Sequence, residues 1–355
     1  MILTLLLLAL FVTVNAQTSL KEINSRYYLN GNSGITLTQS EIKISENGIE
    51  KFSSSISGYK NYLAAPQGKY FLISNQAYDE TQPQYEISLF FFNLNSEIVN
   101  ELKLNASSDL PHPLFKVNDA GKIFAFDPLS FKLIIYDVGK KQEIQLEKDV
   151  PFEMERSSFI EVNENEVYVL TSIRPLMLEE SDANTNLYKI NLNNNLIEKT
   201  LIDFSLPNLL FIYDDDIFIS GVKFNNSAVE GKTIKLNNQL QTVNSNSFSF
   251  NKMIRSGNDF IGLSNNSVIK MDNNLSVKAE YGFDNSRLID LAADKNLIKI
   301  LLKEDDTDYI AALDDKLQLI SKQPIQINDI TDNASILFSD NKMIIHTKDR
   351  TYLAE

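Results

Sequence analysis

The sequence predicts an all-β protein assembled from repeated antiparallel sheets. Three observations predict this fold: stretches in which apolar and polar residues alternate, a short turn phrase that recurs along the chain, and the lack of any amphipathic helix of normal length. The chain has 355 residues, of which 43% are hydrophobic, so it is long enough to bury an extensive core.

The turn phrase consists of a Leu-type residue, two Asn- or Asp-type residues, a free position and a second Leu-type residue. Its copies begin at Leu94, Leu192, Leu236, Met271 and Leu313. Each copy separates two stretches with a period of two residues, which is typical of strands that bury one face more than the other. Because Asn and Asp tolerate the positive φ that tight hairpin turns require, we interpret each copy as a β-hairpin.

A second series of short strands alternates with these hairpins. The seven strands are QGKYFLIS, AGKIFAFD, ENEVYVLT, DDDIFISG, GNDFIGLS, DKNLIKIL and DNKMIIHT. Looser hairpins near Glu46–Gly48 and Val138–Lys141 complete the first series, and the hairpins then recur every roughly 35 to 55 residues. This period is typical of one four-stranded blade. We therefore predict a β-propeller of antiparallel blades, with seven blades favoured and six or eight as alternatives.

The two ends of the chain predict how the ring closes. The C-terminal DNKMIIHTKDRTYLAE is an incomplete blade, and the N-terminal EIKISENGIEKF supplies strands without a preceding partner. We expect N- and C-terminal strands to share one blade, because such closure leaves no unpaired edge in the ring. In these features the chain resembles the secreted β-propeller proteins, a resemblance of architecture that transfers no functional residue.

The first residues form an apolar run that ends in Val14-Asn15-Ala16, which predicts a signal peptide over residues 1–16 with cleavage after Ala16. The run is shorter than the about 20 residues that a transmembrane helix needs. The predicted protein is therefore secreted or periplasmic, with a lead-in over 17–34 and a single propeller domain over 35–355. We predict no integral membrane span after cleavage.

Composition excludes several kinds of site. The chain has no cysteine, which excludes disulfides, thiolate metal sites and a cysteine nucleophile. Its net charge of -14 argues against nucleic-acid binding, which depends on Lys and Arg. The only histidines, His112 and His346, are too few for a multi-histidine metal site, and no G-x-S-x-G motif accompanies them.

Two acidic segments raise the question of calcium. Tyr213–Phe218 and Lys303–Tyr309 are rich in Asp, but neither matches the D-x-[DN]-x-[DN]-G calcium loop. Asp is also a common turn residue, so we interpret both segments as turns. No cofactor is predicted, and a calcium ion held by side chains from several blades stays as an alternative.

Three long loops follow second strands, over residues 75–86, 172–186 and 222–232. In a propeller such loops open on the same face as the connections between blades, and long loops within a compact domain are often functional. The predicted binding residues on this face are Tyr78, Asp79, Glu80, Tyr85, Arg156, Arg174, Leu176, Met177, Glu179 and Glu180. Tyr, Arg and Met are enriched at protein interfaces, although the loops are equally explained as tolerated insertions.

Two functions are compatible with these features. The first is a monomeric, non-catalytic binding or scaffolding propeller that holds a protein, peptide or glycan on its long-loop face. The alternative is a hydrolase or lyase with a carboxylate-based site, with or without calcium, at the mouth of the central channel, since a carboxylate pair performs acid–base chemistry without histidine. We favour the binding protein.

Overall fold

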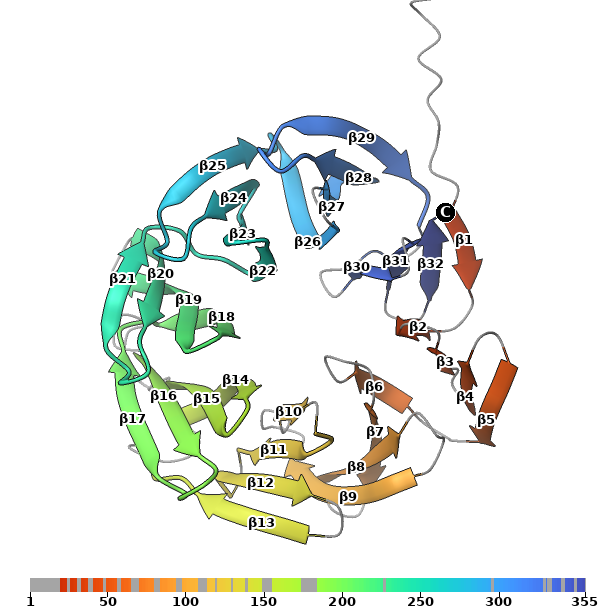
Figure 1. Cartoon of the computed structure of the whole chain (residues 1–355), viewed down its shortest axis with the longest axis vertical. Helices are drawn as coiled ribbons and strands as arrows, with labels where there is room; N and C mark the ends of the chain where they lie inside the picture. Colours follow the sequence, from red (N-terminus) through yellow and green to blue (C-terminus); the bar gives the residue numbers. More distant parts are fainter. Residues whose placement is uncertain are drawn as a thin grey trace, which may run out of the picture.

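The computed structural model is an all-β ring of four-stranded antiparallel sheets, which is a β-propeller (Figure 1). Eight such sheets are formed by the described residues. The residues that the structure describes are 20–23, 26–30, 33–37, 41–46, 49–55, 59–64, 70–79, 84–93, 98–107, 114–118, 120–128, 130–137, 140–148, 155–173, 184–225, 228–294, 297–327, 330, 334–339, 342–347 and 350–354. Within these ranges there is no helix with the length and apolar character that a membrane crossing requires.

Seven of the sheets are formed by four strands that are consecutive in the chain. Their strands are β2–β5 (Arg26–Asn30, Ser33–Leu37, Glu41–Glu46, Ile49–Ser55), β6–β9 (Tyr59–Ala64, Tyr70–Asp79, Gln84–Asn93, Ile98–Ser107), β10–β13 (Leu114–Val117, Ile123–Asp127, Lys132–Asp137, Lys140–Gln145), β14–β17 (Glu155–Asn163, Glu166–Ile173, Asn184–Asn191, Ile197–Ile202), β18–β21 (Leu206–Tyr213, Asp216–Asn225, Ala228–Leu236, Thr242–Asn246), β22–β25 (Lys252–Ser256, Asp259–Ser264, Ser267–Met271, Val277–Gly282) and β26–β29 (Ser286–Asp294, Leu297–Glu304, Thr307–Leu313, Leu319–Ile325).

The eighth sheet closes the ring. It combines the C-terminal strands β30–β32 (Ser335–Ser339, Lys342–His346, Thr351–Ala354) with the N-terminal strand β1 (Leu20–Ile23). β1 pairs antiparallel with β32, from Leu20 opposite Ala354 to Ile23 opposite Thr351. The predicted closure by strands from both ends is therefore confirmed, and Figure 1 shows β1 outermost in this sheet.

The strand that completes the closing sheet is not the one expected from the sequence. The segment EIKISENGIEKF forms β4 and β5, which belong to a separate sheet with β2 and β3. Residues 20–34, assigned to the lead-in, supply β1, β2 and the start of β3. The Asn30–Ser33 pair closes the β2–β3 hairpin, and this additional hairpin brings the described sheets to eight where seven blades were favoured.

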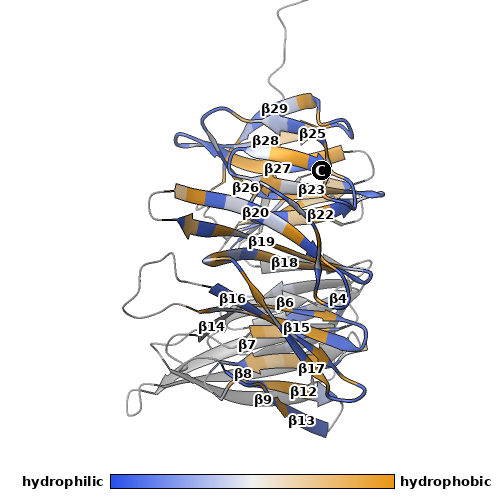
Figure 2. Ribbon diagram, turned by 90° about the vertical axis from the view of Figure 1, so that its left-hand side faces the viewer, coloured by the Kyte–Doolittle hydropathy of each residue, from blue (hydrophilic) through white to orange (hydrophobic). Residues whose placement is uncertain are grey.

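The core lies between neighbouring sheets. On β15, Val167 and Val169 pack toward the β10–β13 sheet, while Tyr168 and Leu170 pack toward the β18–β21 sheet. Second strands are therefore buried on both faces, which explains why they are almost continuously apolar (Figure 2). Such cores lie between each pair of neighbouring sheets from β10–β13 round to the sheet that closes the ring.

The recurring turn phrase adopts one conformation in three of its copies. In the copy from Leu236 to Leu240, Oδ1 of Asn237 accepts hydrogen bonds from the backbone N–H groups of Gln239 and Gln241 at 3.0 Å each. Asp272 and Asp314 do the same in their copies. The phrase that begins at Leu192 forms a different turn with Asn195 at φ 57°, and residues 94–97 lie outside the described residues.

Positive φ in these three turns occurs at the final Leu rather than at the predicted Asn/Asp pair. Leu240, Leu275 and Leu317 have φ values of 59°, 61° and 60°. The first polar residue is instead engaged through its side chain in the turn hydrogen bonds. Each of the three leucines is at most 8% exposed, so burial of its side chain offsets the strained backbone.

The same turns receive lysines from the preceding sheet. Each lysine lies on a third strand, forms an ion pair with an acid at the start of the second strand, and donates to a carbonyl of the next sheet's turn. The three sets are Lys189 with Glu166 and the Asn238 carbonyl, Lys235 with Asp216 and the Asn273 carbonyl, and Lys270 with Asp259 and the Asp315 carbonyl. The repeated phrase thus joins adjacent blades in addition to turning the chain. We call each set a lysine latch.

Candidate functional site

Two of the three predicted long loops, 75–86 and 222–232, prove to be, in large part, extensions of the antiparallel ladders, and residues 174–183 of the third lie outside the described residues. β19 and β20 stay paired from Val222 opposite Gly231 to Asn225 opposite Ala228. β7 and β8 stay paired to Asp79 opposite Gln84, and β15 and β16 to Ile173 opposite Asn184. We call the side of the ring that carries these hairpin ends and the connections between sheets the hairpin face.

The predicted binding residues divide into two groups. Tyr78 and Tyr85 are opposite each other in the β7–β8 ladder, Asp79 follows Tyr78, and Arg156 lies opposite Ser172. The other six, Glu80, Arg174, Leu176, Met177, Glu179 and Glu180, lie outside the described residues. The backbone therefore brings Tyr78 and Tyr85 together, and the contribution of the whole set to binding stays a prediction.

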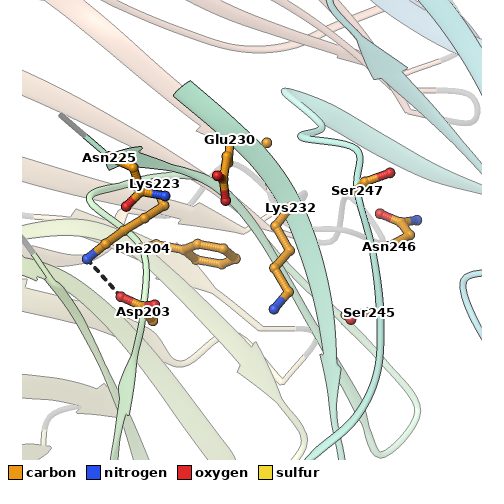
Figure 3. A pocket seen from close by; sticks show the side chains of 10 residues that line it. Asp203, Phe204, Lys223, Asn225, Glu230, Lys232, Ser245, Asn246 and Ser247 are labelled. Atoms are coloured by element: carbon orange, nitrogen blue, oxygen red, sulfur yellow. Dashed lines mark ion pairs between the residues drawn. The ribbon is translucent and has the colours of Figure 1, made fainter. Parts of the chain in front are cut away.

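A pocket of about 680 Å³ opens on the hairpin face of the β18–β21 sheet (Figure 3). Its volume falls within the range of about 300 to 1,000 Å³ that is usual for ligand sites. Its walls come from the β17–β18 connection, the β19–β20 hairpin and the end of β21. The lining residues are Asp203, Phe204, Lys223, Asn225, Glu230, Gly231, Lys232, Ser245, Asn246 and Ser247.

Two lysines lie on either side of the Phe204 ring in this pocket (Figure 3). Nζ of Lys223 is 2.7 Å from Oδ1 of Asp203, which forms an ion pair at one end. Glu230 is opposite Lys223 in the β19–β20 ladder, so acidic groups flank Lys223. Lys232 is exposed and forms no ion pair with an acid among the described residues. Lys223 is therefore held in an ion pair, whereas Lys232, which shares a face of β20 with Glu230, borders the pocket without one.

The connection that forms the floor of the pocket is fixed by the neighbouring strands. Oγ1 of Thr185 donates to the Phe204 carbonyl at 3.0 Å, and the N–H of Ser205 donates to the Val222 carbonyl at 2.9 Å. A Cβ atom at Gly221 would lie 2.7 Å from the Leu206 carbonyl oxygen and 3.1 Å from the Phe204 ring. Glycine at 221 is therefore needed for Phe204 to pack against the sheet, and the pocket has a rigid base.

The wall formed by β21 and its following connection is equally well held. Oγ1 of Thr233 donates to the Phe248 carbonyl at 2.7 Å and is hydrogen-bonded to Oγ of Ser220 at 2.8 Å. Oδ1 of Asn246 accepts from the N–H of Phe248 at 3.1 Å. Thr233 and Ser220 are fully buried, so these bonds form in a medium of low dielectric constant and strongly constrain the chain.

Carboxylates on the innermost strands pair with lysines of adjacent sheets. Glu161 on β14 is 2.8 Å from Lys116 on β10, and Asp290 on β26 is 2.6 Å from Lys252 on β22. Asp290 also accepts a hydrogen bond from the N–H of Ile336 on β30 at 2.8 Å. These carboxylates thus join sheets to one another. In the described part of the chain, no three His, Asp or Glu side chains are grouped as a metal site.

Both acidic segments contain tight turns, as predicted. Tyr213 is opposite Asp216 in the β18–β19 hairpin, with Asp214 at φ 50° between them. Glu304 is opposite Thr307 in the β27–β28 hairpin, with Asp305 at φ 48°. Asp and Asn adopt positive φ more readily than most residues, which explains their use here.

The two histidines differ in what the structure describes. His346 on β31 is 5% exposed, and its Nδ1 is 3.0 Å from Oγ1 of Thr351 on β32. It therefore packs inside the sheet that closes the ring. His112 lies outside the described residues.

Sequence reasoning placed Lys223 and Lys232 in a long loop but missed the rest of the pocket. Asp203 and Phe204 come from the connection between β17 and β18, and Ser245–Ser247 come from the end of β21 and the connection that follows it. These residues could have been found from the rule that connections between sheets open on the same face as the hairpins after second strands. Applied to residues 222–232, that rule selects the connections before and after the β18–β21 sheet.

Comparison with known proteins supports the fold. No family model matches the chain, and no curated protein matches its sequence. Solved structures with a similar fold include the dihydro-heme d1 dehydrogenase NirN in complex with DHE, with a TM-score of 0.56 and 9% identity over 85% of this chain and 66% of that chain.

Two further solved structures are a puromycin hydrolase and AztD from Citrobacter koseri. The hydrolase has a TM-score of 0.54 and 9% identity over 82% of this chain and 50% of that chain, so our chain spans about half of it. AztD has a TM-score of 0.51 and 12% identity, with 86% of each chain covered. The neighbours are β-propeller-type proteins, and at these identities they establish the fold alone.

Proposed function

We propose that this protein is a non-catalytic binding propeller that acts outside the cytoplasm and holds a protein, peptide or glycan on its hairpin face. The observation that carries this proposal is the pocket of about 680 Å³ between the β19–β20 hairpin and the two adjacent connections. Its base and one wall are held by buried hydrogen bonds, so the pocket is preorganised and a ligand meets little ordering cost.

The charge distribution supports binding to a polar partner. Hydroxyl, amide, ammonium and carboxylate groups surround the opening, and these groups fix the orientation of a ligand through directional bonds. The inner-strand carboxylates Glu161 and Asp290 are each paired with a lysine of an adjacent sheet, an arrangement that joins the sheets. The hydrolase or lyase alternative requires two carboxylates close to each other, and Glu161 and Asp290 do not form such a pair.

The test is capture on peptide and glycan arrays by the mature chain from Gln17, followed by a variant in which residues 223–230 are replaced by Asn-Gly. Val222 and Gly231 are ladder partners, so a two-residue turn joins them and removes one pocket wall. The control is Lys316→Ala, an exposed residue in a turn on the opposite face.

Capture that is lost in the shortened variant and retained in Lys316→Ala supports the proposal. A ligand that binds the hairpin face also raises the melting temperature of the wild type and not that of the shortened variant. Capture that survives the shortening, or turnover of a captured peptide or glycan, contradicts it.

A further inference from the structure

A second, smaller cavity lies next to the pocket on the hairpin face. This cavity has a volume of about 240 Å³ and lies between β17 of one sheet and β20–β21 of the next. It is lined by Thr200, Leu201, Ile202, Asp203, Phe204, Lys232, Ile234, Leu236, Leu240 and Thr242. Asp203, Phe204 and Lys232 line both cavities, so the two spaces meet at these residues.

Six of the ten residues that line the smaller cavity are apolar, whereas Phe204 is the one large apolar residue in the lining of the larger pocket. Ile202, Ile234, Leu236 and Leu240 belong to the core between the two sheets, and this cavity extends the core toward solvent. Binding is favoured when an apolar group replaces water against the apolar surface that lines such a space. The cavity therefore suits a single apolar side chain of a ligand.

Lys232 lies where the apolar cavity meets the polar pocket. Lys223 is neutralised by Asp203 at 2.7 Å, whereas no described acid forms an ion pair with Lys232. Lys232 is opposite Gly221 within the β19–β20 ladder, so its backbone position is fixed. An exposed ammonium group that borders a pocket and forms no ion pair is available to bind an anionic ligand group.

An anion that belongs to the same small unit as an apolar group satisfies both features. The last residue of a polypeptide carries its carboxylate and its side chain on one Cα atom. An internal Asp or Glu has no such apolar group beside its carboxylate, and a neutral sugar supplies no anion. The terminal residue thus places a carboxylate at Lys232 while its side chain enters the apolar cavity.

We infer that this double cavity captures the C-terminus of a polypeptide that ends in an apolar residue. Lys232 binds the terminal carboxylate, the space lined by Ile202 and Ile234 receives the last side chain, and the preceding residues lie in the larger pocket beside Ser245 and Ser247. Recognition of a terminal carboxylate is an established mode of peptide binding. This inference rests on the proposed function and specifies the ligand of the same site.

The experiment measures the affinity of the mature chain for four probes by isothermal titration calorimetry. The probes are acetyl-Ala-Ala-Ala-Leu with a free carboxylate, its C-terminal amide, acetyl-Ala-Ala-Ala-Ser with a free carboxylate, and octanoate. The protein variants are Lys232→Met and, as the matched control on the opposite face, Lys316→Met. Both lysines are exposed, so neither substitution removes a buried interaction, and melting temperatures check that both variants fold.

We expect the free-acid Leu peptide to bind about tenfold more tightly than its amide, since a hydrogen bond to a charged group contributes about that much. Lys232→Met abolishes this difference and Lys316→Met retains it. The Ser peptide binds more weakly than the Leu peptide, because its side chain leaves the apolar cavity unfilled.

The inference is overturned by equal affinity for acid and amide, by equal affinity for the Leu and Ser peptides, or by no binding of any probe. Octanoate that binds more tightly than the Leu peptide also overturns it, in favour of a free fatty acid. If the inference fails while array capture still depends on residues 223–230, the proposed function stands with a different ligand. If the inference fails and array capture does not depend on residues 223–230, the proposed function is contradicted as well.

Discussion

The lysine latch between the β18–β21 and β22–β25 sheets predicts a large effect for Lys235→Met. Nζ of Lys235 is 2.7 Å from Oδ2 of Asp216 and donates to the Asn273 carbonyl of the next sheet at 3.0 Å. The lysine side chain is only 8% exposed, and methionine fills a similar volume without its charge. The substitution therefore removes two charge-assisted hydrogen bonds and leaves little cavity.

The magnitude follows from these contacts. Hydrogen bonds to charged groups contribute about 1.5 to 3 kcal/mol each. Asp216 is one-quarter exposed and keeps a hydrogen bond from Nδ2 of Asn273 at 3.1 Å, so part of the loss is recovered. We expect a loss of about 2 to 3 kcal/mol in the free energy of unfolding. The entropy of unfolding is about 2.1 cal/mol/K per residue, so this loss lowers the melting temperature by ~3 to 4 °C.

Thermal unfolding followed by circular dichroism measures this change against two further variants. Lys141→Met removes an ion pair of 2.6 Å with Glu143 in which both side chains are well exposed, so its melting temperature changes by less than about 1 °C. The double variant Lys235→Met with Asp216→Asn recovers part of the loss, because it removes the carboxylate left without its cation. A Lys235→Met protein that melts within 1 °C of the wild type refutes the latch.

Two other predictions concern packing and charge. Gly262→Ala lowers the free energy of unfolding by about 1 to 3 kcal/mol, because the added Cβ would lie 2.4 Å from the Phe250 ring. The control Gly282→Ala, whose Cβ would have its nearest atom 3.9 Å away, leaves the melting temperature unchanged. Equal changes in melting temperature for the two variants contradict this packing. Burial raises the pKa of the Asp308 carboxyl, and its Oδ1 has no hydrogen-bond partner among the described residues. Because the folded pKa is above the unfolded one, the charged form is penalised at neutral pH, and the penalty disappears as the pH falls below about 3.9. Asp308→Asn should therefore raise the melting temperature at pH 7 and match the wild type near pH 3, and a gain that is the same at both pH values contradicts this explanation.

Much of the architecture could be predicted because each blade repeats the same local chemistry. The copies at Leu236, Met271 and Leu313 form the same turn, and the second strands are apolar because both of their faces are buried. The conformation inside the turn was not predictable from residue preference. Asn and Asp are engaged there through side-chain hydrogen bonds, and the strained φ falls on a leucine whose burial offsets it.

The additional N-terminal sheet was missed for a local reason. Residues 17–34 were predicted as a lead-in, because Gly31 and Gly34 are typical of turns and the preceding RYYLN lacks a clear alternation of apolar and polar residues. β3 pairs with β2 at one edge and with β4 at its other edge, so the β2–β3 hairpin is stabilised by the whole sheet. Single-strand patterns do not contain that information.

The candidate site was predicted as a face and not as a pocket. The hairpin that contains Lys223 and Lys232 was recognised by its length, but its pairing converts most of the expected loop into ladder. Successive side chains of that ladder point to opposite faces, and this alternation sets which of them border the pocket. Phe204 joins it from the connection between β17 and β18, and Ser245 joins it from the end of β21, so both come from outside the hairpin.

The central claim is that ligands bind on the hairpin face, and hydrogen–deuterium exchange of the complex with an array-selected ligand tests it most directly. We predict slower exchange in residues 223–232 and 245–247, with no change in the inner strands β14 and β26 that carry Glu161 and Asp290. Protection confined to those inner strands, with the hairpin unaffected, would contradict the account and place the ligand at the centre of the ring.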